Sequence, residues 1–304
     1  MQHQVDRLLD QANGVILGKE RQLRLAVACV VAGGHLLIED LPGVGKTTLA
    51  HLLARLLGLE MHRVQFTSDL LPADILGASV YDRDRGCFEF HAGPVFTQLL
   101  LADEVNRATP KTQSALLEAM EEHQATVDGI SRRLPEPFFV IATQNPGSQT
   151  GTYPLPESQL DRFLLSLEMG YPDHAAEREL LQGADRRALI DGLDSLLDAE
   201  ALLALRQQAR EIHVANALID YVQALLKRTR TADARGPGLS PRAGLALVHA
   251  AQAWALVGGD TAVLPEHIQA VFPHVAAHRL QTGSMGLATA REASERLLAD
   301  VAIP

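Results

Sequence analysis

The chain has 304 residues, of which 47% are hydrophobic, and it carries a formal net charge of -10. This length allows two domains of ordinary size, and the hydrophobic content can supply a sizeable core. The negative charge opposes non-specific binding to DNA, no apolar run is long enough to span a membrane, and the polar N-terminus is not a secretion signal. Because Cys29 and Cys87 are far apart and have no C-x-x-C partner, we expect a cytoplasmic globular protein without disulfides.

The first elements are two helices around an apolar loop. Residues 3–13 and 19–32 have apolar residues at helical spacing, and residues 14–18 separate them. The loop precedes the first strand closely, so Ile16, Leu17 and Gly18 are candidates for an adenine pocket. Packing of the apolar loop residues in the core is an equally good interpretation.

Residues 35–48, HLLIEDLPGVGKTT, predict a strand, a glycine-containing loop and the start of a helix. The phosphate-loop template is G-x-x-x-x-G-K-[ST], in which backbone N–H groups surround phosphates, the lysine reaches the outer phosphates and the hydroxyl binds Mg²⁺. Gly45, Lys46 and Thr47 match its end, whereas Asp40 replaces the first glycine. Asp tolerates left-handed backbone better than most residues. The strand and helix on either side favour a nucleotide site over a chance turn, with these candidate residues: Asp40, Pro42, Gly43, Val44, Gly45, Lys46, Thr47 and Thr48.

A strand at 61–66 follows, then a helix or turn at 68–77. Alternation across residues 79–90 predicts a β-hairpin. A helix at 109–123 begins with Thr109-Pro110, and a second hairpin is centred on Asp128-Gly129, a strong hairpin signal.

Two buried strands deliver polar residues to one edge of the predicted sheet. Residues 98–102 lead into Asp103 and Glu104, and residues 138–142 lead towards Asn145. Ligands of open α/β sheets bind at the carboxyl ends of the strands, where the phosphate loop also lies. Solvated carboxylates and an Asn-Pro turn are the simpler alternatives.

ATP hydrolysis needs a phosphate cradle, a metal ion and an oriented water. Lys46 and the loop amides can hold the phosphates, and Thr47 with Asp103 can hold Mg²⁺. Glu104 can polarise the attacking water, and Asn145 can position that water or contact the γ-phosphate.

The character of the chain changes near residue 173. A short helix at 157–162 and a strand at 163–167 end the α/β part. Six helical segments follow, at 174–190, 198–210, 215–230, 240–257, 264–281 and 284–304. We therefore predict a nucleotide-binding α/β domain at 1–172 and a smaller all-helical domain at 173–304. Local rules alone place Arg162 and Arg242 as surface residues.

The order of motifs resembles the MoxR-type AAA+ ATPases. The resemblance rests on these segments: DLPGVGKT at 40–47, LADEVNRA at 101–108, ATQNP at 142–146, LDRF at 160–163 and SPR at 240–242. It implies a phosphate-loop parallel sheet flanked by helices, two inserted β-hairpins and a helical lid. It also implies that Asn145 is the first sensor, that Arg162 is an arginine finger given to a neighbouring subunit, and that Arg242 is the second sensor on the lid. Asp at the first loop position is common in that family.

The resemblance further implies a ring, usually a hexamer, that binds ATP and Mg²⁺ and remodels a partner protein. Partners in that family often contain a von Willebrand factor A domain or are metalloenzymes. This chain has no D-x-S-x-S motif, so such a partner is a separate polypeptide.

Two other functions stay open. One is a nucleic-acid-stimulated AAA+ motor similar to minichromosome maintenance helicases, which share both hairpins. In such a motor, the hairpin residues Arg83, Arg85, Arg132 and Arg133 could face a pore. The net charge of -10 argues against binding to nucleic acid. A nucleotide switch without turnover is disfavoured by the Asp103-Glu104 pair.

Overall fold

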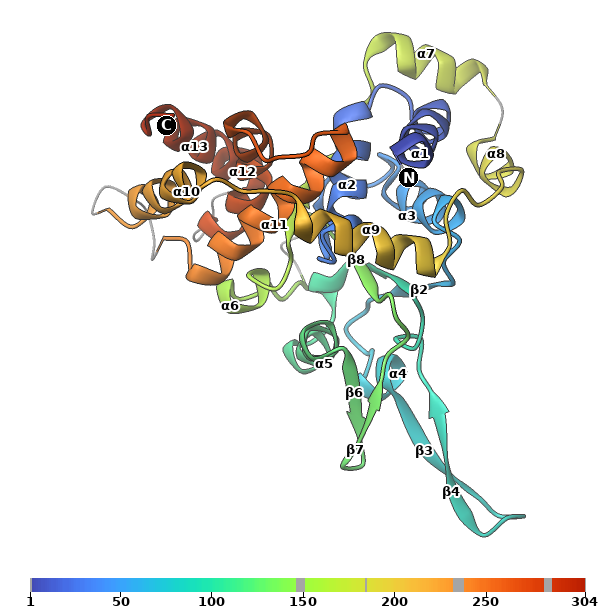
Figure 1. The fold of residues 1–304 in the computed structure, drawn as a ribbon. Coiled ribbons are helices and arrows are strands. Elements are labelled where there is room, and N and C mark those ends of the chain that lie inside the picture. The colour runs from blue at the N-terminus through green and yellow to red at the C-terminus, as the bar shows by residue number, and fades with distance from the viewer. Residues whose placement is uncertain (1, 146–150, 184, 232–237, 282–285, 304) are drawn as a thin grey trace.

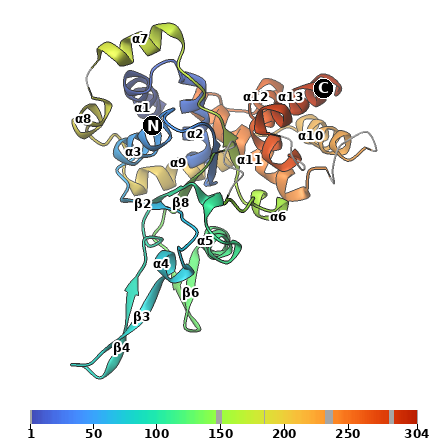
Figure 2. The ribbon, with the colours of Figure 1, turned by 180° about the vertical axis from the view of Figure 1, so that it is seen from behind.

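The computed structural model describes residues 2–145, 151–183, 185–231, 238–281 and 286–303 (Figure 1). Pro146 of the Asn-Pro motif lies outside these ranges. A parallel sheet forms the centre of the molecule, two hairpins project from one side of it, and helices cover the rest (Figures 1 and 2).

The central sheet has five strands in the order β2-β5-β8-β1-β9, and all of its pairings are parallel. The strands are β1 (Leu36–Glu39), β2 (Met61–Gln65), β5 (Leu99–Asp103), β8 (Phe139–Gln144) and β9 (Leu165–Leu167). Parallel strands share their carboxyl ends. The residues that follow β1, β5 and β8 therefore meet at one edge of the sheet.

The two faces of the sheet pack into separate cores. Leu36 and Ile38 of β1 belong to the core formed with α1 (Gln2–Val15), α2 (Glu20–Val31) and α3 (Lys46–Leu56). Leu37 faces the other way, into the core formed with α4 (Pro72–Leu76) and α5 (Pro110–Glu122). Successive side chains of a strand point to opposite faces, which explains why Leu36, Leu37 and Ile38 are all apolar.

Both predicted hairpins are present. They are β3 (Gly77–Asp82) with β4 (Cys87–Ala92), and β6 (Gln124–Val127) with β7 (Ile130–Arg133). Asp128 and Gly129 have positive φ angles of 53° and 76°, as the tight turn of a two-residue hairpin loop requires. The hairpins extend away from the sheet on the side of α4 and α5 (Figures 1 and 2).

The remaining helices are α6 (Glu157–Leu160), α7 (His174–Gln182), α8 (Arg186–Asp191), α9 (Ala199–Glu211), α10 (Asn216–Thr229), α11 (Pro241–Gly258), α12 (Pro265–Leu280) and α13 (Leu287–Ala299), and a 3₁₀ turn covers Val105–Arg107. The single helix predicted at 174–190 is wrong. Gly183 ends α7, and the Asp185 carboxylate caps α8 by accepting from the Arg187 amide.

Helices α10 to α13 form the lid, whereas α7 and α8 lie on the other side of the molecule, near α1 and α3 (Figures 1 and 2). The predicted fold class is confirmed: a parallel sheet with flanking helices and two inserted hairpins is followed by a helical lid. The domain boundary at residue 173 stays a prediction.

Candidate active site

The phosphate loop connects β1 to α3. Gly43 and Gly45 have φ angles of 85° and 95°, in the left-handed region that glycine adopts without strain. Asp40 does not have a positive φ angle, so glycine is not required there. Its carboxylate instead accepts hydrogen bonds from the amides of Leu41 (2.7 Å) and Gly170 (2.6 Å). The left-handed backbone expected at Asp40 is therefore not present, and the Asp40 side chain instead connects the loop to the segment after β9.

Lys46 lies at the centre of the candidate site. Its Nζ donates to the Asp40 carbonyl (2.6 Å) and to Asn145 Oδ1 (2.8 Å). Burial lowers the pKa of Lys46, and the carboxylates of Asp40, Asp103 and Glu104 oppose that shift. Most of the predicted residues line one cavity of about 310 Å³, namely Pro42, Gly43, Gly45, Lys46, Thr47, Thr48, Asp103, Glu104 and Asn145. Val44 instead packs against the core.

Asp103 and Thr47 are the candidate metal ligands. Asp103 Oδ1 accepts from Thr143 Oγ1 (2.6 Å), and Oδ2 pairs with the guanidinium of Arg63 (2.7 Å). In the described part of the chain, no three His, Cys, Asp or Glu residues cluster as a metal cage would require. Mg²⁺ bound with nucleotide needs only one or two oxygen ligands from the protein, because phosphates and water supply the others. A carboxylate and a hydroxyl on one cavity fit that requirement.

Glu104 is held in place from several sides. Its Oε1 accepts from Asn145 Nδ2 (2.8 Å), and its Oε2 accepts from Gln65 Nε2 (3.0 Å) and pairs with Arg107 Nε (3.0 Å). Its backbone adopts a φ of 56°, which is uncommon outside glycine. Because the Asn145 amide donates to Glu104 and accepts from Lys46, it connects the candidate base to the phosphate-binding lysine.

Sequence reasoning missed four neighbours of this site, namely Arg63, Gln65, Arg107 and Thr143. Gln65 ends β2, which pairs with β5, so the rule that found Asp103 and Asn145 also applied to it. Thr143 Oγ1 accepts from the Glu104 amide (2.9 Å) while donating to Asp103. Thr143 lies in the ATQNP segment at 142–146, on which the family resemblance partly rests.

The predicted adenine loop does not line the cavity at the phosphate loop. Ile16 is buried in the core with α1 and α2, and Gly18 lies against Asp173 and Ala176. Lys19 Nζ donates to the Tyr171 carbonyl (2.8 Å). The loop therefore packs beside the segment whose Gly170 amide binds Asp40. A contact of Ile16, Leu17 and Gly18 with adenine stays a prediction.

Arg162 and Arg242 lie at the opposite edge of the sheet. Arg162 precedes β9, and both side chains line a cavity with His35, which precedes β1. Five residues of extended chain separate His35 from Asp40, a span of about 16 Å. The structure therefore places Arg242, the expected second sensor on the lid, away from the phosphate loop of its own chain.

One carboxylate holds both arginines. Arg162 Nη2 binds Glu121 Oε2 (2.9 Å), and Arg242 Nη1 binds Glu121 Oε1 (2.8 Å). No local sequence signal marks Glu121, because its partners are far away along the chain. Glu121 lies on the last turn of α5, and its side chain reaches Arg162 and Arg242 only in the folded protein.

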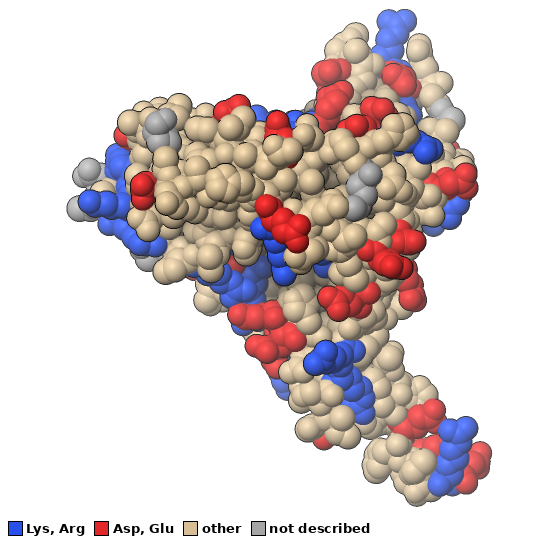
Figure 3. Space-filling view, viewed as in Figure 1, with Lys and Arg blue, Asp and Glu red and all other residues tan. Residues whose placement is uncertain are grey.

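The hairpin arginines are partly engaged within the chain. Arg85 pairs with Asp82 (3.5 Å) and Glu89 (3.2 Å), and the guanidinium of Arg132 stacks over the ring of Phe90 at 3.8 Å. Acidic and basic side chains alternate at the end of the longer hairpin (Figure 3). This surface does not favour a polyanion.

Comparisons with known proteins agree with this geometry. The family of ATPases associated with various cellular activities (AAA) matches residues 35–165, and the AAA lid domain matches residues 227–300. Chaperone MoxR1 of Mycobacterium tuberculosis is 38% identical over 91% of this chain and 76% of its own. Protein MoxR of Paracoccus denitrificans is 34% identical over 88% and 86%. A crystal structure of a presumed ATPase from Cytophaga hutchinsonii has a TM-score of 0.87 and 33% identity, covering 100% of this chain and 96% of that one.

Proposed function

Because the chain belongs to the MoxR family of AAA+ ATPases, we propose that it hydrolyses ATP between neighbouring copies in a ring, a hexamer, and uses the energy to remodel a separate protein. The main support for this proposal is the position of Arg162 and Arg242. The phosphate loop lies at one edge of the sheet, and Arg162 and Arg242 lie at the other. A head-to-tail ring places these two edges of neighbouring copies together.

Within one copy, the residues of the carboxyl edge have distinct roles. Lys46 and the loop amides bind the phosphates, and Thr47 with Asp103 would hold Mg²⁺, which neutralises charge on the phosphates when it is bound. Glu104 takes a proton from the attacking water. Asn145 orients Glu104 through a 2.8 Å hydrogen bond and keeps Lys46 close to the same point.

The neighbouring copy completes the site. Arg162 and Arg242 supply positive charge as the γ-phosphate leaves, a contribution of roughly a thousandfold or more for an arginine finger. Hydrolysis is then coupled to assembly, since a single copy cannot place its own arginines at its own phosphate loop.

A separate client protein is supported by the chaperone name of MoxR1. The finer proposal, a client with a von Willebrand factor A domain or a metalloenzyme, rests on the family resemblance, as does the cytoplasmic location. None of the helices in the described ranges could cross a membrane. The neighbouring hairpins expose Val80, Tyr81, Phe88 and Ile130, apolar side chains that a client could contact.

Mixed rings test the shared site. Lys46→Ala should abolish ATP binding, whereas Glu104→Gln should bind ATP and stall turnover by about a hundredfold or more. Rings of Arg162→Ala alone should be inactive, and mixing them with Glu104→Gln rings should restore turnover, because some interfaces then combine an intact Arg162 with an intact Glu104. Absence of rescue, with mixed assembly shown by native mass spectrometry, would contradict the shared site.

The client proposal has its own test. Glu104→Gln rings loaded with ATP should retain a purified von Willebrand factor A domain protein encoded by the source organism, and Lys46→Ala rings should not. Equal retention by both variants would argue against a nucleotide-dependent remodeller.

A further inference from the structure

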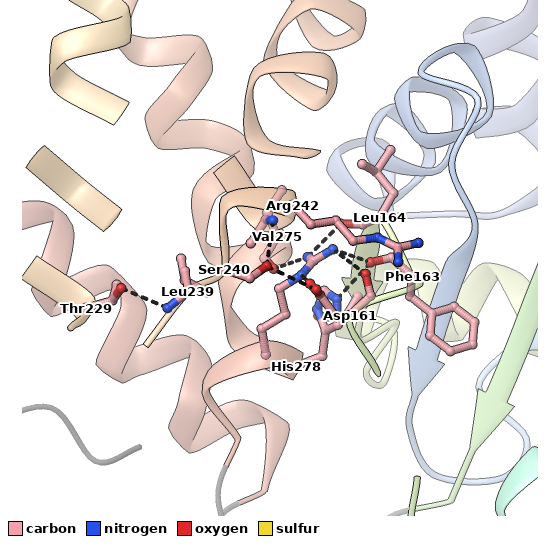
Figure 4. Close-up of polar contacts among 12 residues, drawn as sticks. Asp161, Phe163, Leu164, Thr229, Leu239, Ser240, Arg242, Val275 and His278 are labelled. Carbon is pink, nitrogen blue, oxygen red and sulfur yellow. Dashed lines mark hydrogen bonds and ion pairs between the residues drawn. The ribbon is translucent and has the colours of Figure 1, made fainter. Parts of the chain in front are cut away.

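Arg279 of the lid is buried against the turn that carries Arg162. Its side chain is 5% exposed, and it lies near the end of α12. Arg162 lies between α6 and β9, in a short turn that runs from Asp161 to Leu164. Figure 4 shows Asp161, Phe163 and Leu164 of this turn beside the lid residues Ser240, Val275 and His278.

Hydrogen bonds use every N–H donor of the Arg279 guanidinium. Nε donates to Asp161 Oδ1 (2.6 Å), Nη1 to the carbonyls of Leu164 (3.2 Å) and Val275, and Nη2 to the carbonyls of Asp161 (3.2 Å) and Phe163 (2.7 Å). A guanidinium has five such donors in a fixed plane. Lysine could not reproduce this pattern, since an ammonium has three donors around one point.

These contacts hold the turn on both sides of Arg162. The carbonyls of Asp161 and Phe163 flank it directly, and both bind the same nitrogen of Arg279. A second residue of the lid also binds the turn, because Ser240 Oγ donates to Asp161 Oδ2 (3.0 Å). Ser240 is also the N-cap residue of α11. The Asp161 carboxylate, which comes from the residue before Arg162, therefore binds both the start of α11 and the end of α12.

Burial of a guanidinium is costly unless its partners compensate. Burial lowers the pKa of Arg279, and the adjacent Asp161 opposes that shift. Three of the five hydrogen bonds go to backbone carbonyls of the Asp161–Leu164 turn, and one goes to its acidic side chain. The arrangement is specific for the backbone path of this turn, which sets where the Arg162 side chain starts.

We propose that Arg279 is a positioning residue for Arg162: by fixing the turn around it, the lid of one copy sets the geometry in which that copy's arginine reaches the ATP of its neighbour. This inference rests on the proposed shared site. A small displacement of an arginine finger weakens its contact with the transition state strongly, since catalytic groups must be placed to within a fraction of an ångström.

Arg279→Lys tests the inference, with Arg206→Lys as the matched control. Arg206 is partly buried, and its Nε donates to the Val30 carbonyl and not to the turn of Arg162. Arg279→Lys should lower kcat by at least about tenfold and leave the KM for ATP within about twofold, because the phosphate loop is untouched. Arg206→Lys should keep both values. Equal loss in the two variants would overturn the proposal.

Mixed rings separate a positioning role from a purely structural one. Arg279→Lys mixed with Glu104→Gln should regain activity, to roughly a quarter of the wild-type rate, since one interface in four pairs an intact donor with an intact acceptor. Arg279→Lys mixed with Arg162→Ala should not exceed the low rate of Arg279→Lys rings alone, because neither copy donates a well-placed arginine. Rescue by Arg162→Ala instead would show that Arg279 serves its own nucleotide site and would overturn the inference.

Two measurements keep the outcome decisive. If mixed rings of Arg162→Ala and Glu104→Gln show no turnover, the proposal of a shared site is wrong. If those rings are active but mixed rings of Arg279→Lys and Glu104→Gln stay at the low rate, only the proposed role of Arg279 is wrong. Asp161→Asn serves where Arg279→Lys does not fold. It keeps an oxygen for Arg279 but removes the charge, and it should show the same pattern of rescue.

Discussion

Arg162 and Arg242 meet on a single carboxylate, although 80 positions of sequence separate them: each binds one oxygen of Glu121, at 2.9 Å and 2.8 Å. One arginine comes from the turn before β9 and the other from the first turn of the lid helix α11. Glu121 therefore keeps two like charges side by side and connects the lid to the α/β domain. Both arginines face the edge of the sheet opposite to the phosphate loop.

Replacing Glu121 with Gln should lower the ATPase rate of the assembled protein. Without the negative charge, the two guanidinium groups repel each other and lose their common orientation. We expect a fall in kcat of roughly three- to tenfold with unchanged ATP binding to the isolated copy. Glu118→Gln, on the exposed side of the same helix, is the control. An unchanged kcat in Glu121→Gln would show that the carboxylate does not orient the arginines.

Thr143 should be needed for both carboxylates of the site. Thr143→Val keeps the shape of the side chain but removes the hydroxyl that donates to Asp103 and accepts from the Glu104 amide. The loss of these buried hydrogen bonds should lower the free energy of unfolding by about 1–3 kcal/mol. It should also raise the Mg²⁺ concentration needed for half-maximal turnover. Thr143→Ser keeps the hydroxyl and should retain activity in a magnesium titration; equal behaviour of the two variants would contradict this role.

Acid should destabilise the protein through buried histidines. Burial lowers the pKa of His35 and of His274 to about 3, whereas a histidine of the unfolded chain has a pKa near 6.5. Between these values the unfolded state binds more protons, so the free energy of unfolding falls as the pH drops below about 6.5. Each ring contributes a loss of about 2 kcal/mol at pH 5.

Urea unfolding at several pH values checks this expectation. His274→Gln should have a shallower pH dependence than the wild type, and His91→Gln, on the exposed strand β4, should not. Identical slopes in His274→Gln and the wild type would show that His274 is not the group that binds the proton.

Single-stranded DNA should not stimulate turnover. Arg132 stacks on Phe90, Arg85 pairs with two carboxylates, and the chain carries a net charge of -10. ATPase assays with and without DNA should agree within about twofold at physiological salt. Stimulation of several-fold that disappears in the Arg132→Ala, Arg133→Ala double variant would instead favour a nucleic-acid motor.

The strands, the phosphate loop and the polar residues at the carboxyl edge could all be predicted from the sequence. These features depend on local patterns: apolar runs, glycines before a helix, and acidic or amide residues directly after a strand. Because the strands are parallel, Asp103, Glu104 and Asn145 had to meet the loop of Lys46, and they do.

The positions of the arginines, in contrast, depend on how distant segments of the chain pack together. Arg242 and Arg279 come from two helices of the lid, Glu121 comes from α5, and Arg162 comes from the turn before β9. These four residues are far apart in the sequence and come together only when the chain folds. Local rules assigned Arg162 and Arg242 to the surface and were silent on Glu121 and Arg279. Ion pairs between distant segments depend on how helices pack, and that packing has no local sequence signature.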